Sequence, residues 1–146
     1  MHKMIFVNLP VADLDASREF FGKLGYSFDE RFTDENAAAL VLGDAIVAML
    51  LKRDFYQTFV PGKTIIDAKS TSGAILCLSA ESREEVTAIV DKAVAAGATF
   101  GDTEDHGFMF GSSFYDLDGH GWEIMWMDPA AVEAGPEAYA AQQHAQ

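Results

Sequence analysis

An order of predicted elements that occurs twice is the feature that most constrains the fold of this chain. In the first half, residues 4–9 predict a strand and residues 13–24 predict an amphipathic helix. Gly25 follows, and glycine is the residue type that most often stands after a helix C-terminus. Three further strands are predicted at residues 26–32, 37–42 and 45–52.

The second half repeats this order. Residues 73–80 predict a strand, Ser82 and Glu85 form a capping-box pattern that opens a helix, and Gly97 follows that helix. The remaining strands are predicted at residues 99–102, 109–115 and 122–127. Because this period is longer than that of solenoid repeats, we predict an α+β fold built from two copies of one strand–helix–three-strand module.

The segment between the two modules differs from both. Residues 53–72 predict a long loop or a short helix, because Pro61 and Gly62 interrupt them. We therefore expect a single domain with a first module at 1–52, a connecting segment at 53–72, a second module at 73–128 and a C-terminal tail at 129–146.

Composition excludes several classes of partner. The net charge of −13 over 146 residues would repel a phosphate backbone, so we expect no nucleic-acid partner. No apolar run is long enough to span a membrane, and residues 1–6 do not resemble a signal peptide. The only cysteine, Cys77, lies in an apolar strand, where we interpret it as a core residue. We expect a cytoplasmic protein without disulfides.

The last predicted strand contains the clearest functional signal. Side chains alternate between the two faces of a strand, so Glu123 shares its face with Met125 and Met127. A carboxylate beside two apolar side chains is costly unless it meets a cation, a metal or hydrogen-bond donors, or takes up a proton. We therefore expect Glu123 to be the centre of a functional site.

Two motifs resemble those of the vicinal oxygen chelate superfamily. Residues 7–14 (VNLPVADL) are similar to its opening, and residues 116–123 (DLDGHGWE) are similar to its closing motif. The superfamily includes glyoxalase I, extradiol dioxygenases, fosfomycin-resistance enzymes and bleomycin-binding proteins. The resemblance implies two paired modules that form a half-open barrel around a cavity, and it implies a homodimer.

The resemblance also implies a divalent metal held by side chains from four strands. The corresponding positions here are Phe6, Met49 or its neighbour Ala48, Ile75 and Glu123. Only Glu123 has a ligand type that suits such a metal. We therefore predict no cofactor, and a divalent metal, if bound at all, would have Glu123 as its one retained ligand. The sequence contains no motif that is typical of nicotinamide, flavin or nucleotide binding.

Other candidates accompany Glu123. Asn8 shares a strand face with Phe6, and its amide can donate to and accept from a ligand. His106 is either a general base or replacement ligand, or a loop histidine tied to neighbouring acids. The candidate catalytic residues are thus Glu123 and His106, and the candidate ligand-binding residues are Phe6, Asn8, Met49, Ile75, Phe110, Glu123 and Met125.

Three functions are compatible with these observations. The first is a small-molecule-binding protein of bleomycin-resistance type, whose acidic charge favours a cationic ligand. The second is an enzyme, either a glyoxalase-type lyase or isomerase or an extradiol-type dioxygenase, that uses Glu123 with an atypical metal or with none. The third is a dimeric structural module with an idle cavity.

Overall fold

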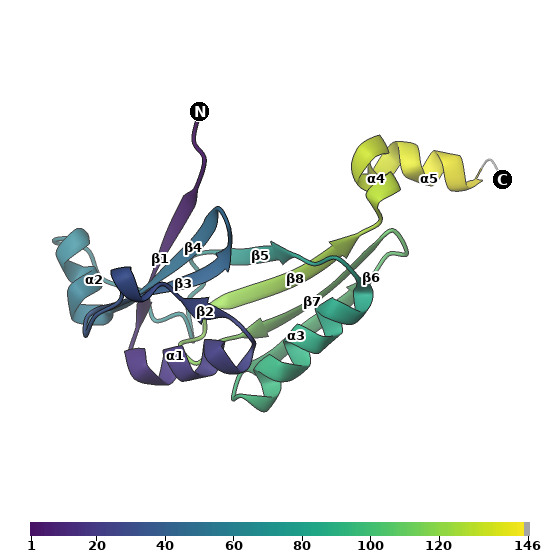
Figure 1. Cartoon of the computed structure of the whole chain (residues 1–146). Coiled ribbons are helices and arrows are strands. Elements are labelled where there is room, and N and C mark those ends of the chain that lie inside the picture. The colour runs from purple at the N-terminus through teal and green to yellow at the C-terminus, as the bar shows by residue number, and fades with distance from the viewer. Residues whose placement is uncertain (145–146) are drawn as a thin grey trace. The chain divides into compact units, whose positions relative to one another are not determined.

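The computed structural model describes residues 1–144, which form two compact units. The first unit contains residues 1–73 together with 117–120, and the second contains residues 74–116 together with the chain from Gly121 onward. Each unit is a four-stranded sheet with one long helix along one of its faces (Figure 1). The duplicated order predicted from the sequence is therefore present.

In the first unit the sheet has the strand order β1-β4-β3-β2, with β1 and β4 parallel and the other pairs antiparallel. Its elements are β1 (Ile5–Val11), α1 (Leu14–Lys23), β2 (Ser27–Phe28), the 3₁₀ helix η1 (Glu30–Phe32), β3 (Ala37–Gly43), β4 (Ile46–Lys52) and α2 (Arg53–Phe59). Helix α2 opens the connecting segment.

Helix α1 forms because its apolar residues recur on one face, which packs against β3 and β4. The side chain of Asp13 caps its first turn by accepting a hydrogen bond from the Ala16 amide at 3.0 Å. Phe20 and Phe21 of α1 are buried, as are Leu40 of β3 and Leu50 of β4, and together they belong to the core of this unit. Most residues of β3 and β4 are buried or half-buried, so these two strands form the centre of the first sheet.

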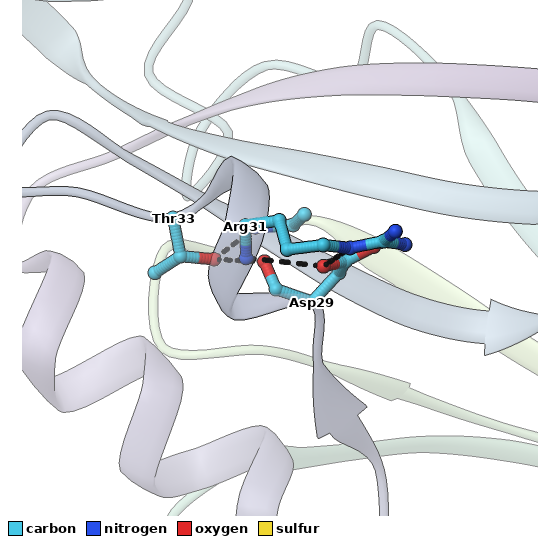
Figure 2. A network of polar contacts seen from close by, with 4 residues as sticks. Asp29, Arg31 and Thr33 are labelled. Carbon is cyan, nitrogen blue, oxygen red and sulfur yellow. Dashed lines mark hydrogen bonds and ion pairs between the residues drawn. The ribbon is translucent and has the colours of Figure 1, made fainter.

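One predicted strand was wrong in part. Residues 26–32 were expected to be extended, but only β2 is a strand, and residues 30–32 form η1. Figure 2 shows the reason: the carboxylate of Asp29 accepts from the backbone amide and the guanidinium of Arg31, and the Thr33 hydroxyl donates to the Asp29 carbonyl at 2.8 Å. Asp29 therefore closes a turn that local apolar alternation could not reveal.

The second unit has the strand order β5-β8-β7-β6, with β5 and β8 parallel. Its elements are β5 (Ile75–Ser79), α3 (Arg83–Ala95), β6 (Thr99–Asp105), β7 (Met109–Tyr115), β8 (Gly121–Met127), α4 (Pro129–Ala134) and α5 (Pro136–His144). The last two helices follow the end of β8 and form the predicted C-terminal tail (Figure 1).

Helix α3 covers one face of this second sheet. The predicted cap is confirmed, since the Glu85 amide donates to the Ser82 hydroxyl at 3.0 Å. Val86 and Val90 are buried on the helix, and Trp122 is buried on β8, where its indole N–H donates to Asp116 at 2.9 Å. Along β8 the even-numbered positions of the apolar run therefore face α3, and Glu123 faces the other way.

Among residues 1–144, no helix is both long and apolar enough to cross a membrane.

Candidate functional site

The uncovered face of the second sheet carries Glu123. The strand register places Glu123 between Cys77 of β5 and Ser113 of β7. Met125, two residues after Glu123 on β8, is half-buried, and Ile75, two residues before Cys77 on β5, is 66% exposed. We call this side of the sheet, defined by Ile75, Cys77, Glu123 and Met125, the Glu123 face. It is open to solvent, and α3 lies on the opposite side.

The Glu123 carboxylate is half-buried and has no partner among the described residues. It takes part in neither a hydrogen bond nor an ion pair within that part of the chain. Its Oε1 atom lies over β7, where a Cβ atom added to Gly111 would be 3.6 Å away. Solvent or a ligand must therefore satisfy this carboxylate, because a desolvated charge without a partner is unfavourable.

Cys77 is a residue that the sequence interpretation placed wrongly. It was expected in the core, but the structure exposes it on the Glu123 face, beside Glu123 on the neighbouring strand. Partial burial raises the pKa of the Cys77 thiol, and the negative charge of Glu123 raises that pKa further. Its parity with Ile75 could have indicated this position, since both side chains point to the same face of β5.

The predicted ligand-binding residues of the first unit lie on β1 and β4. The register pairs Asn8 with Met49, so their side chains are neighbours on one face of the sheet. Phe6 is 56% exposed, Asn8 is exposed and Met49 is half-buried. The side-chain amide of Asn8 has no hydrogen bond within the described residues. The structure thus brings these three residues together on the first sheet.

His106 lies elsewhere, in the turn between β6 and β7. Its Nε2 atom is 3.5 Å from the Glu104 carboxylate, and its side chain is exposed. Along β7 this turn adjoins Met109, which is four residues from Ser113, the register partner of Glu123. At about 3.3 Å per residue this separation is roughly 13 Å. His106 is therefore not positioned beside Glu123.

Phe110 lies on the opposite side of the sheet from Glu123. The guanidinium of Arg83, on α3, lies 5.2 Å from the centres of both the Phe110 and the Trp126 rings. The same guanidinium donates to both carboxylate oxygens of Asp105. Phe110 is thus part of the packing between α3 and the sheet, and the structure does not bring it together with Glu123.

The two motifs that carry the family resemblance meet in the first unit. The Asp118 carboxylate accepts from the Ala12 amide at 2.8 Å, and the His120 side chain is buried with Nε2 2.8 Å from the Pro10 carbonyl oxygen. Gly119 lies so close to residues 68–69 that an added Cβ would be 2.7 Å from the Ala68 carbonyl carbon. These contacts give residues 117–120 a scaffolding role, as expected for a turn.

The residues at the expected metal-ligand positions do not fit a divalent metal. Phe6 and Ile75 offer hydrocarbon side chains, and Met49 offers a thioether, which suits soft Cu(I) rather than Zn²⁺, Fe²⁺ or Mn²⁺. Within residues 1–144, no three His, Cys, Asp or Glu side chains are grouped closely enough to hold a metal ion. We therefore derive no chemistry through a metal for this chain.

Comparisons with known proteins agree with this fold. Residues 3–43 match the sequence model of the bleomycin resistance protein-like N-terminal region. A comparison with curated protein sequences found no match.

Three solved structures illustrate the structural likeness. A hypothetical protein from S. aureus has a TM-score of 0.72 and 22% identity, over 86% of this chain and 94% of its own. A glyoxalase-related enzyme from Fulvimarina pelagi has a TM-score of 0.72 and 22% identity, over 86% and 88%. A fosfomycin resistance protein from Listeria monocytogenes has a TM-score of 0.63 and 15% identity, over 86% and 93%.

These matches establish the predicted fold, that of the glyoxalase/bleomycin resistance/dioxygenase proteins. Together with the match over residues 3–43, they show the fold and a sequence likeness confined to the N-terminal part of the chain.

Proposed function

We propose that this protein binds a small organic molecule on the Glu123 face, and that the molecule presents a cationic group to the Glu123 carboxylate. The observation that carries the proposal is the half-buried carboxylate without a partner among the described residues. A bound cation would supply the missing interaction, and charge-assisted hydrogen bonds are the strongest of their kind.

The surroundings of Glu123 favour a ligand that also has an apolar part. Ile75 is largely exposed and Met125 is half-buried on the same face. Methionine adapts its shape to different apolar partners, and contact with both side chains would remove apolar surface from water. The net charge of −13 would draw cations toward the protein and repel anions. Binding or sequestration therefore suits this face better than metal-dependent catalysis.

A thermal-shift screen tests the proposal. Wild-type protein would be measured against amphipathic organic amines, matched alcohols and matched carboxylates. We expect stabilisation by amines only, by several degrees at concentrations well above Kd. Glu123→Gln should abolish this stabilisation, whereas Glu35→Gln, which removes an exposed carboxylate in the first unit, should leave it intact. Equal responses of wild type and Glu123→Gln to every amine would contradict the proposal.

We also propose that the protein is a homodimer with two-fold symmetry. The exposed apolar side chains of Ile5 and Ile46, which are register partners on β1 and β4, support this, because adjoining exposed apolar side chains commonly mark an interface. Sedimentation at micromolar concentration should give twice the chain mass. Ile5→Asp should weaken the dimer, and Val132→Asp, at a similarly exposed position on α4, should not. A wild-type monomer at these concentrations would contradict this proposal.

A further inference from the structure

The Glu123 side chain leans toward a glycine of the neighbouring strand. Glu123 is in register with Ser113 on β7, yet its Oε1 atom lies over Gly111, two residues further along that strand. A Cβ atom built on Gly111 would lie 3.6 Å from Oε1 and 3.6 Å from the Ile124 carbonyl oxygen, with no other non-neighbouring atom within 4 Å. The carboxylate therefore lies where the atoms beyond the Cβ of a longer side chain would lie.

Backbone geometry does not require glycine at this position. Gly111 is buried within β7, and it is not one of the glycines with a positive φ angle. Glycine in the interior of a strand weakens that strand and often marks a place where another group approaches closely. Here the group that approaches is the Glu123 carboxylate.

We propose that Gly111 is a positioning residue of the Glu123 face. Its missing side chain seats the Glu123 carboxylate over β7, away from Cys77 on β5. This arrangement leaves the β5 side of the carboxylate open, so a ligand's cationic group approaches Glu123 from the side of Cys77. The inference rests on the proposed function for its ligand, but the position of the carboxylate can be tested without one.

Substitutions at Gly111 separate contact from displacement. An alanine methyl group at 3.6 Å from Oε1 would be in ordinary van der Waals contact and would leave the carboxylate in place. The γ-carbons of valine extend one bond, about 1.5 Å, further and would overlap the carboxylate. Because β8 lies between β7 and β5, the carboxylate would then move toward Cys77.

Cys77 is a natural reporter of this movement, since it is exposed and is the only cysteine of the chain. Its rates of reaction with a cationic and an anionic methanethiosulfonate of similar size would be compared as a ratio. We expect Gly111→Val to raise the cationic-to-anionic ratio by about threefold or more over wild type, because a charge acts more strongly at shorter distance. Gly111→Ala should match wild type.

Three controls make the result specific. Glu123→Gln should lower the ratio, and the double variant Gly111→Val/Glu123→Gln should equal Glu123→Gln alone. Gly43→Val, at a strand glycine of the first sheet whose added Cβ would also meet its nearest atom at 3.6 Å, should equal wild type. A merely structural role of Gly111 would not produce a charge-selective change that requires Glu123.

The inference is overturned if folded Gly111→Val has the wild-type ratio, or if its ratio rises equally when Glu123 is replaced. If Gly111→Val does not fold, Gly111→Thr decides instead. The γ atoms of threonine fill the same space as those of valine, so the ratio should rise as expected for Gly111→Val, and a wild-type ratio in Gly111→Thr would overturn the inference. If no amine stabilises the wild-type protein in the thermal-shift screen but Gly111→Val still raises the labelling ratio of Cys77, the proposed function is wrong and the positioning role of Gly111 holds.

Discussion

Replacing Gly119 by alanine should destabilise the protein through two separable effects. Gly119 has a φ of +90°, and a Cβ there would lie 2.7 Å from both the carbonyl carbon of Ala68 and the amide nitrogen of Lys69. Holding a residue other than glycine at such a φ costs roughly 1–3 kcal/mol. Forcing a methyl group against a fixed backbone costs roughly another 1–3 kcal/mol. The total loss should be roughly 2–6 kcal/mol.

Gly62→Ala is the matched control for this substitution. Gly62 has a φ of +80°, but an added Cβ would meet nothing within 4 Å. It should therefore show the backbone cost alone, roughly 1–3 kcal/mol. For a chain of this length each kcal/mol lowers Tm by roughly 2–4 °C, so Gly119→Ala should melt roughly 2–12 °C below Gly62→Ala. Equal unfolding free energies in urea for the two variants would refute the close seating of residues 117–120 on residues 68–69.

Three further experiments test the role of Glu123, the ion pair between Arg83 and Asp105, and the expected lack of a bound metal. Glu123→Gln should leave the thermal stability of the ligand-free protein equal or higher, since no partner of Glu123 is lost. The same variant should speed the reaction of Cys77 with a neutral thiol reagent, because one of the two causes of the raised Cys77 pKa is removed. Slower labelling of Cys77 would contradict this expectation. The hydrogen bond from Arg83 lowers the pKa of Asp105 below its ordinary value of 3.8, so the stabilisation is present above that pH and is lost as pH falls through the lower folded-state pKa. Asp105→Asn should therefore reduce Tm at pH 7 and have less effect near pH 2, and the opposite trend would show that the ion pair does not contribute. Metal analysis of protein purified without chelator should give no stoichiometric divalent metal; about one metal per chain, lost in Glu123→Gln, would show that atypical ligands replace the expected set.

Local patterns predicted the duplicated architecture because its signals are local. The helix caps of Asp13 and Ser82 and the apolar faces of both helices lie within single segments of sequence. The same patterns failed at residues 30–32, where a turn held by Asp29 replaces an extended strand. Apolar alternation over so short a segment is compatible with both structures, and only the side-chain contacts of Asp29 distinguish them.

The candidate site was predicted only in part. The parity of β8 indicated the face of Glu123, and the fold allows Ile75 and Met125 to share it. Cys77 was missed because an apolar strand was interpreted as buried on both faces, whereas β5 has one open face. Phe110 was predicted to bind a ligand, but its ring contacts Arg83 of α3. This contact joins residues that are distant in sequence, and such long-range contacts leave no local pattern.

Native mass spectrometry of protein purified gently from cells tests the central claim most directly. If the Glu123 carboxylate holds a small organic ligand, wild type and Glu35→Gln should carry the same low-mass organic molecule, and Glu123→Gln should carry none. Retention of that molecule by Glu123→Gln at the wild-type level would contradict the claim that Glu123 is the centre of the binding site.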